Sequence, residues 1–216
     1  LTGGVSALQN STDPDVQSWA WVRKGDAQAY EAQSLAESGD LPTARALWQQ
    51  AGECYAQALE IKPDKHEAAN NWGGALYQEA QALAKRGDLP AARALWRQAG
   101  ERYAQALAIK SDYYEAFNNL GNLLHYEAQD LAKSDLPAAQ ALWREAGERY
   151  AQALAIKPDY HKAAYNWGNA LSQEAEALTE RGDLPAARAL WQQAGERYAQ
   201  ALEIKPDNHE AANNWG

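Results

Sequence analysis

An internal repeat constrains the fold of this chain more than any other feature of its sequence. A tetrapeptide of the form Gly/Ser-Asp-Leu-Pro occurs four times, and successive copies begin 48, 47 and 48 residues apart. Its aspartates are Asp40, Asp88, Asp135 and Asp183. Residues 39–73 and 182–216 differ at only three of their 35 positions, which indicates recent duplication. A period of this length, without the alternation typical of strands, predicts a solenoid of helical pairs that bury their apolar faces against each other.

Recurring turn residues divide each repeat into two helices. In the Gly-Asp-Leu-Pro turn, glycine suits the end of one helix, aspartate the N-cap of the next, and proline its first turn. The Lys-Pro-Asp segment at residues 62–64 ends the second helix, and Asp64 with Glu67 has the spacing of a capping box. The same box is predicted at Asp112 and Asp207. These signals predict helices near residues 14–38, 41–61, 65–86, 89–109, 113–133, 136–156, 160–181, 184–204 and 208–216.

An apolar stripe runs along each second helix. In the second repeat it consists of Ala92, Trp96, Ala99, Tyr103 and Ala106, which follow one another at steps of 4, 3, 4 and 3 residues. Such spacing places all five on one face, so we expect them to be buried. The tryptophans predicted to lie in the core at the equivalent position are Trp48, Trp96, Trp143 and Trp191.

Composition excludes several classes of function. The formal net charge is -9, which argues against a nucleic acid or an anionic membrane surface as partner. No apolar run approaches the roughly 18 residues that a membrane span needs. Cys54 is the only cysteine, so no intramolecular disulfide forms, and a cytoplasmic location is the default expectation. Arginine takes its place in the other repeats, which predicts an exposed or flexible site at Cys54 and no role as a tuned nucleophile.

No motif indicates catalysis, a metal or a cofactor. The sequence has no glycine loop that would cradle a phosphate and no nucleophile elbow. His66, His161 and His209 lie at the same position of three repeats, 95 and 48 residues apart, which is too far for one metal site. We therefore expect a protein that is not an enzyme and that has no cofactor.

The sequence resembles the tetratricopeptide repeat in two places. The first is residues 116–124, Ala-Phe-Asn-Asn-Leu-Gly-Asn-Leu-Leu, and the second is the set of Ala, aromatic, Ala and Pro positions in the helix that follows. The resemblance covers residues 14–216, after an N-terminal extension of residues 1–13. A repeat of this family has 34 residues, so each helix here has gained about seven, which is close to two turns and keeps the buried stripe in phase. Trp72, Trp167 and Trp215 replace the leucine of the pattern and are expected to enlarge the core.

This resemblance implies an all-α, right-handed superhelical solenoid of antiparallel helix pairs, with about four pairs and a truncated C-terminal helix. It also implies that the first helices line a concave groove that binds a peptide or protein segment. At 100° per residue, Asn70, Tyr77 and Gln81 lie opposite the buried stripe of their helix. Asparagine amides both donate and accept hydrogen bonds, so a row of them can hold an extended peptide backbone. The candidate peptide-binding residues are Asn70, Asn71, Tyr77, Asn118, Asn119, Asn122, Tyr126, Tyr165, Asn166, Asn169, Asn213 and Asn214.

Several alternatives stay open at this point. The asparagines could be solvated, or bonded to the adjacent repeat, and recur only because the repeat was duplicated. The whole chain could be a structural spacer or a module for end-to-end self-association, or a regulatory or sensor segment of a larger multidomain protein. The chain begins without Met and stops within a recurring motif, so we expect a piece of a longer protein.

Overall fold

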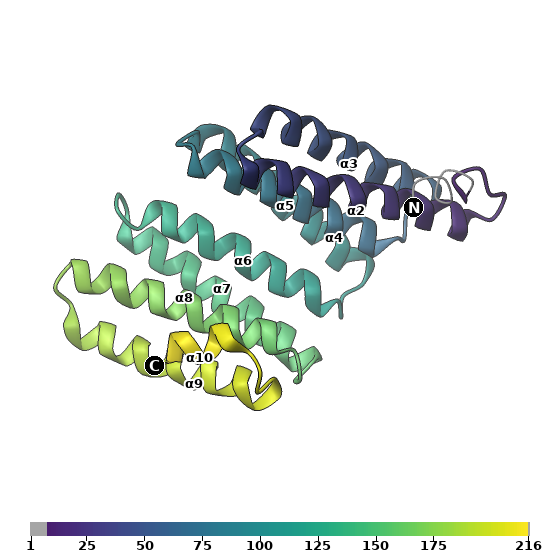
Figure 1. Cartoon of the computed structure of the whole chain (residues 1–216). Helices are drawn as coiled ribbons and strands as arrows, with labels where there is room; N and C mark the ends of the chain where they lie inside the picture. Colours follow the sequence, from purple (N-terminus) through teal and green to yellow (C-terminus); the bar gives the residue numbers. More distant parts are fainter. Residues whose placement is uncertain (1–7, 216) are drawn as a thin grey trace. The chain divides into compact units, whose positions relative to one another are not determined.

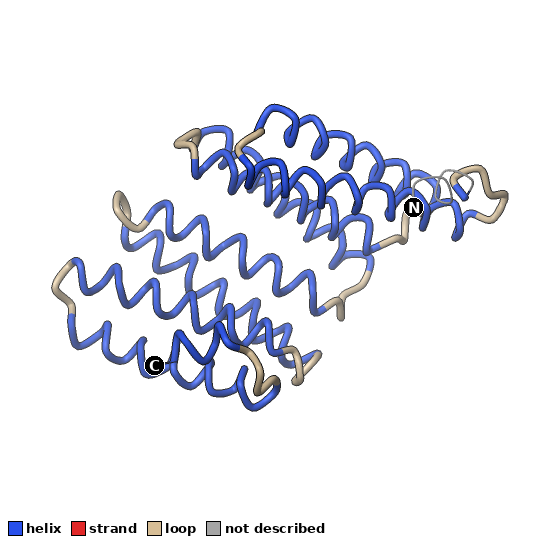
Figure 2. Tube along the Cα trace, in the orientation of Figure 1, coloured by secondary structure: helices blue, strands red, loops and turns tan. Residues whose placement is uncertain are grey.

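The computed structural model describes residues 8–215, and the regular structure in this range is entirely helical (Figures 1 and 2). The helices are α2 (Pro14–Ser38), α3 (Leu41–Ile61), α4 (His66–Lys85), α5 (Leu89–Ile109), α6 (Tyr114–Leu131), α7 (Leu136–Ile156), α8 (His161–Glu180), α9 (Leu184–Ile204) and α10 (His209–Trp215). Most of the predicted N-terminal extension, residues 1–13, lies outside the described residues. The predicted helix boundaries agree with the observed ones to within two residues.

The chain forms two compact units, residues 1–111 and residues 112–216. In the first unit, α2 packs on α3 and α4 packs on α5 as antiparallel pairs, and α3 also packs on α4 (Figure 1). In the second unit, α6 packs on α7 and α8 on α9, and α7 also packs on α8. The predicted all-α fold of antiparallel helix pairs is confirmed, whereas a single repeat domain over residues 14–216 stays a prediction.

Aspartate caps the start of every second helix, as predicted. The side chains of Asp40, Asp88, Asp135 and Asp183 accept hydrogen bonds from backbone N–H groups three residues on, at 3.1 to 3.3 Å. Gly39, Gly87 and Gly182 precede three of these caps with φ between 82° and 99°, a left-handed conformation that favours glycine. The third turn has Ser134 instead, and there α6 ends at Leu131, whose carbonyl accepts from the Ser134 and Asp135 backbone N–H groups.

The predicted capping boxes are wrong. Helix α4 begins one residue later than predicted, with Lys65 at its N-cap and no side-chain cap. The reason is a turn after Pro63, in which the backbone N–H of Lys65 donates to Lys62 O at 3.1 Å and that of His66 donates to Asp64 O at 2.9 Å. Asp64 therefore lies before the cap position. The start of α6 also has no side-chain cap, and at the start of α10 Asn208 accepts from the Ala211 backbone N–H instead.

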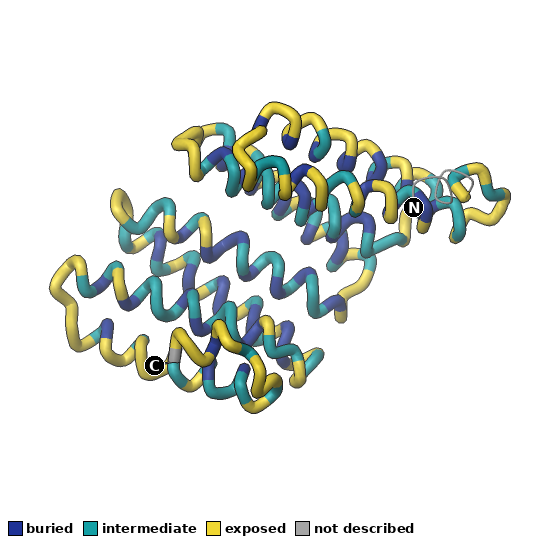
Figure 3. Tube along the Cα trace, viewed as in Figure 1, coloured by how far each residue is buried: buried dark blue, intermediate teal, exposed yellow. Residues whose placement is uncertain are grey.

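The predicted stripe of the second helices forms the core. Ala92, Trp96, Ala99, Tyr103 and Ala106 are all 2% exposed or less, and buried positions line the inner faces of the helices (Figure 3). Trp48, Trp96 and Trp143 are buried as predicted.

The prediction for Trp191 is wrong, because this residue is 41% exposed. In the first unit the C-terminal half of α4 covers Trp48, and Gln78 Oε1 accepts a hydrogen bond from its indole N–H at 3.4 Å. On α9, the following helix α10 has only the seven residues His209–Trp215, which correspond to the first turns of α4. The first half of α9 is therefore uncovered.

A tyrosine from the second helix lies directly on a glycine of the first helix in every pair. The pairs are Tyr55 on Gly25, Tyr103 on Gly73, Tyr150 on Gly121 and Tyr198 on Gly168. A Cβ atom at any of these glycines would lie 2.5 to 2.8 Å from a ring carbon, closer than real side-chain contacts. The close approach of the two helices therefore requires glycine at this position.

Arginine and tryptophan stack within the helix pairs of the second and fourth repeats. The Arg102 guanidinium lies 3.7 Å from the ring centroid of Trp72, and that of Arg197 lies 3.8 Å from Trp167. Both tryptophans are only half-buried, so the prediction that they enlarge the core holds only in part, and the side chain of the third, Trp215, lies outside the described residues.

In the first repeat, Cys54 occupies the arginine position and Lys24 the tryptophan position. Of the two alternatives predicted for Cys54, exposure is wrong, since the residue is 4% exposed and its thiol donates to Gln28 Oε1 at 3.1 Å. Burial raises the pKa of this thiol, while Lys24 opposes that shift, so the cysteine is a poor nucleophile at neutral pH. An arginine at position 54 would lie beside the positive charge of Lys24.

We predict that Cys54→Arg lowers the free energy of unfolding by about 1–2 kcal/mol, because it brings two cations together in a partly buried place. Adding Lys24→Trp to this variant should restore most of the loss by recreating the stacked pair, which is worth about 0.5–2 kcal/mol. Urea denaturation of the wild type, both single variants and the double variant measures the coupling energy. Losses that simply add in the double variant would contradict the pairing.

Candidate functional site

The candidate peptide-binding residues lie on the first helices of the repeats. Within the first unit these helices are α2 and α4, and within the second unit they are α6 and α8, and the two helices of each unit pack side by side. In the second unit the structure brings predicted residues of adjacent first helices together, whereas in the first unit the predicted residues all lie on α4.

In the first unit the asparagine pair bridges α4 and α2. Asn70 is 6% exposed and donates to Asn71 Oδ1 at 3.2 Å, while Asn71 Nδ2 donates to Asp26 Oδ1 on α2 at 2.9 Å. Asn70 is thus buried, although its helical phase places it opposite the core stripe. The reason is that α4 contacts α2, α3 and α5, so that more than one of its faces is covered. Tyr77 is half-buried, and its hydroxyl accepts from Gln81 Nε2 at 2.8 Å.

In the second unit the amides make a similar set of bonds. Asn118 is 4% exposed, donates to Asn119 Oδ1 at 3.3 Å, and accepts from Asn166 Nδ2 on α8 at 3.0 Å. Tyr126 is 36% exposed and packs edge-on against the ring of His125.

At the end of the second unit an amide of α10 forms hydrogen bonds to α8. Asn214 Nδ2 donates to Asn169 Oδ1 at 3.1 Å and to the Tyr165 hydroxyl at 3.4 Å. Asn213 and Asn214 are both exposed. Asn71, Asn166 and Asn214 therefore form hydrogen bonds to the adjacent repeat, as one of the alternatives for the asparagines held.

The core tyrosines join the same hydrogen-bond network, which the sequence reasoning missed. The hydroxyls of Tyr55, Tyr150 and Tyr198 donate to the residue that follows the packed glycine, which is Asp26, Asn122 and Asn169 respectively, at 2.9 to 3.0 Å. Burial raises the pKa of each of these tyrosines, so the hydroxyls stay protonated as donors. The sequence contained a signal for these bonds, because each tyrosine follows the polar residue after the glycine by 28 or 29 positions. In the second repeat that residue is Gly74, which has no side-chain acceptor.

His125 is a buried neutral histidine within this region. It is 6% exposed, and its Nδ1 accepts a hydrogen bond from the Trp143 indole N–H at 3.3 Å. Burial lowers the pKa of His125 to about 4, so the ring is uncharged at neutral pH. Its acceptor nitrogen is therefore engaged with an indole.

Neither a cluster of metal-ligating side chains nor a helix that could span a membrane occurs in the described part of the chain. Within residues 8–215, no three His, Cys, Asp or Glu side chains gather in a way that could hold a metal ion. In the same range, no helix combines the length and the apolar character that crossing a bilayer requires.

Three segments of the chain match the family model described as the tetratricopeptide repeat: residues 25–50, 73–98 and 168–193. Each match begins at a glycine that is in contact with a tyrosine ring, continues through the Asp-Leu-Pro turn and ends in the second helix. The fold and these matches define a helical-repeat protein of the kind that serves as an interaction scaffold. The three matched segments are tetratricopeptide repeats, and they lie in a chain whose repeat has 48 residues and correspondingly long helices.

Similar solved structures include YrrB, described as a TPR protein with an unusual peptide-binding site, at 14% identity over 98% of this chain and 95% of that chain, with a TM-score of 0.33. BtubC from P. vanneervenii has 17% identity over 92% of this chain and 70% of its own, with a TM-score of 0.43. The pilF protein of Pseudomonas aeruginosa has 19% identity over 88% and 90%, with a TM-score of 0.37. A comparison with curated proteins found no match. Similarity at this level gives no information about a ligand.

We predict that the stability of the wild type falls between pH 6.5 and pH 4 through His125, because the unfolded chain takes up a proton that the folded ring excludes. A folded pKa below the unfolded value of 6.5 means that this loss is absent above about pH 7 and largest near pH 4. It amounts to at most about 3 kcal/mol.

His125→Gln keeps an acceptor for Trp143 and removes this titration. Denaturant unfolding at pH 7 and pH 4 should therefore show a smaller loss in His125→Gln than in the wild type. His209→Gln, at an exposed histidine, serves as control and should follow the wild type. Identical pH profiles for all three proteins would contradict the assignment.

Proposed function

We propose that the chain binds a peptide or protein segment along the first-helix faces of its repeats, and that it acts as a protein–protein interaction scaffold. The observation that carries this proposal is the row of amides along the line where adjacent first helices meet. Asn71 and Asn166 each use one N–H to hold the neighbouring first helix. Because an asparagine amide has two donors and one acceptor oxygen, each retains hydrogen-bonding capacity for a peptide backbone.

Partly exposed tyrosines beside these amides also favour peptide binding on the first-helix face. Tyr126 is 36% exposed, and Tyr77 and Tyr165 are half-buried, so phenol rings flank the amides in both units. Tyrosine provides large contact area at low conformational cost, which suits it to recognition surfaces. Amides and phenols carry no net charge, so we expect the affinity to depend little on salt.

We propose no catalytic role for the chain. Two side chains of the types that act as nucleophile or base are unsuited to that role: Cys54 is buried with a raised pKa, and His125 is neutral and bonded to Trp143. The net charge of -9 favours protein or peptide over nucleic acid or membrane as partner. A cytoplasmic location is part of this proposal and rests on the single cysteine.

End-to-end self-association is a second candidate function, which exposed hydrophobic residues favour. Trp19 and Tyr30 on α2 are 45% and 79% exposed, and Leu184 and Trp191 on α9 are 49% and 41% exposed. Exposed apolar groups of this size are typical of contact surfaces. Sedimentation of the protein over a concentration series tests this candidate.

We predict that Asn71→Ala together with Asn166→Ala weakens binding at least tenfold for a peptide selected on the wild-type protein from a random display library. The reason is that both substitutions remove backbone-binding donors from the proposed face. Isothermal titration calorimetry measures the affinity.

A matched control is Tyr55→Phe together with Tyr198→Phe. These changes remove hydroxyl bonds to Asp26 and Asn169 and leave the two amides in place. Both double variants should lose some thermal stability, but only the asparagine variant should lose the peptide. Equal affinity losses in the two variants, or none in the asparagine variant, would contradict the proposed function.

A further inference from the structure

Two asparagine side chains on the first-helix face of the second unit have their oxygens bound to core tyrosines. Asn122 on α6 accepts a hydrogen bond from the Tyr150 hydroxyl at 2.9 Å, and Asn169 on α8 accepts one from the Tyr198 hydroxyl at 2.9 Å. Asn169 Oδ1 also accepts from Asn214 Nδ2 at 3.1 Å, so both of its lone pairs are used. The tyrosine hydroxyls therefore fix both amides with their Nδ2 groups turned away from the core.

These two amides are donors without a partner in the protein. Within residues 8–215, neither Asn122 Nδ2 nor Asn169 Nδ2 donates to another residue, and both side chains are half-buried. The first unit has no such pair, because Asp26 and Gly74 occupy the equivalent positions and neither has a side-chain N–H. A ligand that binds both amides of the second unit has to present hydrogen-bond acceptors at two points.

The spacing of the two donors fits one backbone conformation. Asn122 and Asn169 each follow the glycine that packs on a core tyrosine, so their separation follows that of two packed helix axes, about 8–10 Å. In a polyproline II helix every third carbonyl points the same way, about 9 Å apart. In a β-strand every second carbonyl does so, about 7 Å apart. The pair therefore matches polyproline II better than an extended strand.

A tyrosine ring lies on either side of this pair. Tyr126 follows Asn122 by four residues and Tyr165 precedes Asn169 by four, so each ring is one turn away from the amide on its own helix. Because α6 and α8 run in the same direction, the rings lie on opposite sides of the line that joins the amides (Figure 1). Tyr126 is 36% exposed and Tyr165 is half-buried, so both offer apolar surface to a proline ring.

Acceptors on α8 limit how many prolines a ligand can contain. Asn166 Nδ2 donates to Asn118 Oδ1 at 3.0 Å, whereas Asn166 Oδ1 has no partner within residues 8–215. In the same range Gln173 Oε1, one turn after Asn169, is buried without a partner. A segment of prolines alone has no N–H for these oxygens. The segment that fits therefore has other residues between its prolines.

We propose that the first-helix face of the second unit binds a proline-rich segment in the polyproline II conformation. Carbonyl oxygens three residues apart accept from Asn122 and Asn169. Prolines pack on Tyr126 and Tyr165, and the N–H of an intervening residue donates to Asn166. Proline holds the segment in this conformation before binding, which lowers the entropy that binding costs. The inference rests on the proposed function and names the kind of segment that the second unit takes.

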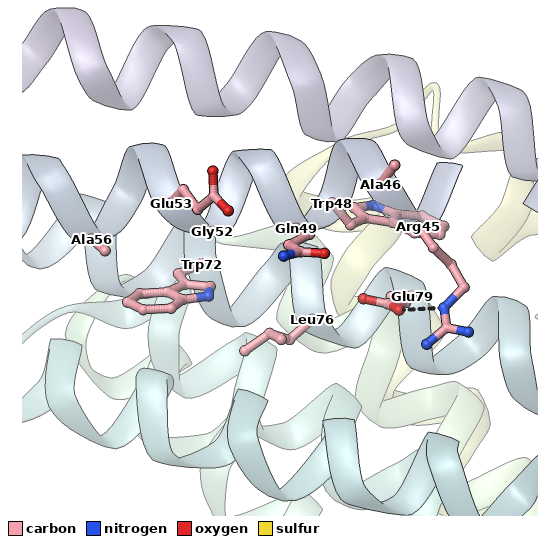
Figure 4. A pocket seen from close by; sticks show the side chains of 10 residues that line it. All are labelled: Arg45, Ala46, Trp48, Gln49, Gly52, Glu53, Ala56, Trp72, Leu76 and Glu79. Atoms are coloured by element: carbon pink, nitrogen blue, oxygen red, sulfur yellow. Dashed lines mark hydrogen bonds and ion pairs between the residues drawn. The ribbon is translucent and has the colours of Figure 1, made fainter. Parts of the chain in front are cut away.

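Two cavities lined by indoles are the alternative place for such a segment, since proline rings also pack on tryptophan. Trp72 lines a cavity of about 650 Å³ between α3 and α4 (Figure 4), and Trp167 lines one of about 880 Å³ between α7 and α8. These indole cavities lie between a second helix and the first helix that follows it. The two indole N–H groups therefore report on binding away from the tyrosines and amides.

The test uses the whole chain, labelled with ¹⁵N, and two capped octapeptides, Pro-Pro-Ala-Pro-Pro-Ala-Pro-Pro and Gly-Gly-Ala-Gly-Gly-Ala-Gly-Gly. The side-chain NH₂ resonances are assigned with Asn122→Asp and Asn169→Asp, and the indole resonances with Trp72→Phe and Trp167→Phe. We expect the proline peptide to shift both NH₂ pairs with one dissociation constant and to leave the indoles unshifted. The glycine peptide, which has the same alanines and no fixed conformation, should shift none of them at the same concentration.

Asn122→Asp together with Asn169→Asp removes the donors and keeps an acceptor for each tyrosine hydroxyl, as Asp26 does for Tyr55 in the first unit. We therefore expect this variant to fold. The proline peptide should bind it at least tenfold more weakly, as read from the backbone N–H resonance of Tyr126.

Gln192→Glu together with Gln193→Glu is the matched control. Both residues are exposed on the second helix α9, and the double change adds the same two negative charges. It should leave the affinity for the proline peptide unchanged.

Four outcomes would overturn the inference: no NH₂ shift at millimolar proline peptide, equal shifts with the glycine peptide, shifts of the indoles in place of the amides, or an unchanged affinity in Asn122→Asp/Asn169→Asp. The peptide selected on the wild-type protein separates the inference from the proposed function. If that peptide binds and loses affinity in Asn71→Ala/Asn166→Ala while the proline peptide shifts no amide, the inference is rejected and the proposed function stands. If neither peptide binds, both are rejected.

Discussion

The contact between a tyrosine ring and a glycine backbone holds each helix pair together, and the other features of the repeat depend on it. Because glycine has no side chain, the ring of Tyr150 or Tyr198 lies against the first helix and is almost completely buried. Burial of an aromatic side chain of this size stabilises the folded state by about 1.5–3 kcal/mol. The same contact points the hydroxyl at the residue after the glycine, which joins the amide network. Core packing and the candidate site thus share one side chain.

Most of the fold was predictable because its signals are local. The Asp-Leu-Pro turns determine where each second helix begins, and all four begin and end at the predicted residues. The segments before α4 and α6 misled the prediction because a turn over residues 63–64 and 111–112 places Asp64 and Asp112 one residue before the N-cap. This turn forms with Ser111 as well as with Pro63, so proline does not cause the difference. Trp191 was also mispredicted, since burial of a repeated residue depends on the length of the helix that follows it, which the repeat pattern does not contain.

Less of the candidate site was predictable, because it depends on contacts between repeats. Helical phase places Asn70 opposite the core stripe, but a helix with three packed neighbours has no single exposed face. Spacing alone also does not show that Asn71 reaches Asp26, or that Asn166 reaches Asn118, since these bonds join residues 45 and 48 positions apart. The indole cavities were missed for a related reason. Trp72 and Trp167 read as core residues in a periodic sequence, and only the structure shows one edge of each ring open to a cavity.

The junction between α3 and α4 has the same glycine, the same two tryptophans and the same leucine as the junction between α7 and α8. Each repeat therefore offers its successor a surface that any other repeat could occupy. A gene encoding such an array can gain or lose a whole repeat by unequal recombination without creating a new interface. Near-identical segments such as residues 39–73 and 182–216 are what that process leaves behind. Differences confined to a few positions, such as Arg45 against Gln140 and Gln49 against Arg144, are then the places where the surface of one repeat departs from that of its copies.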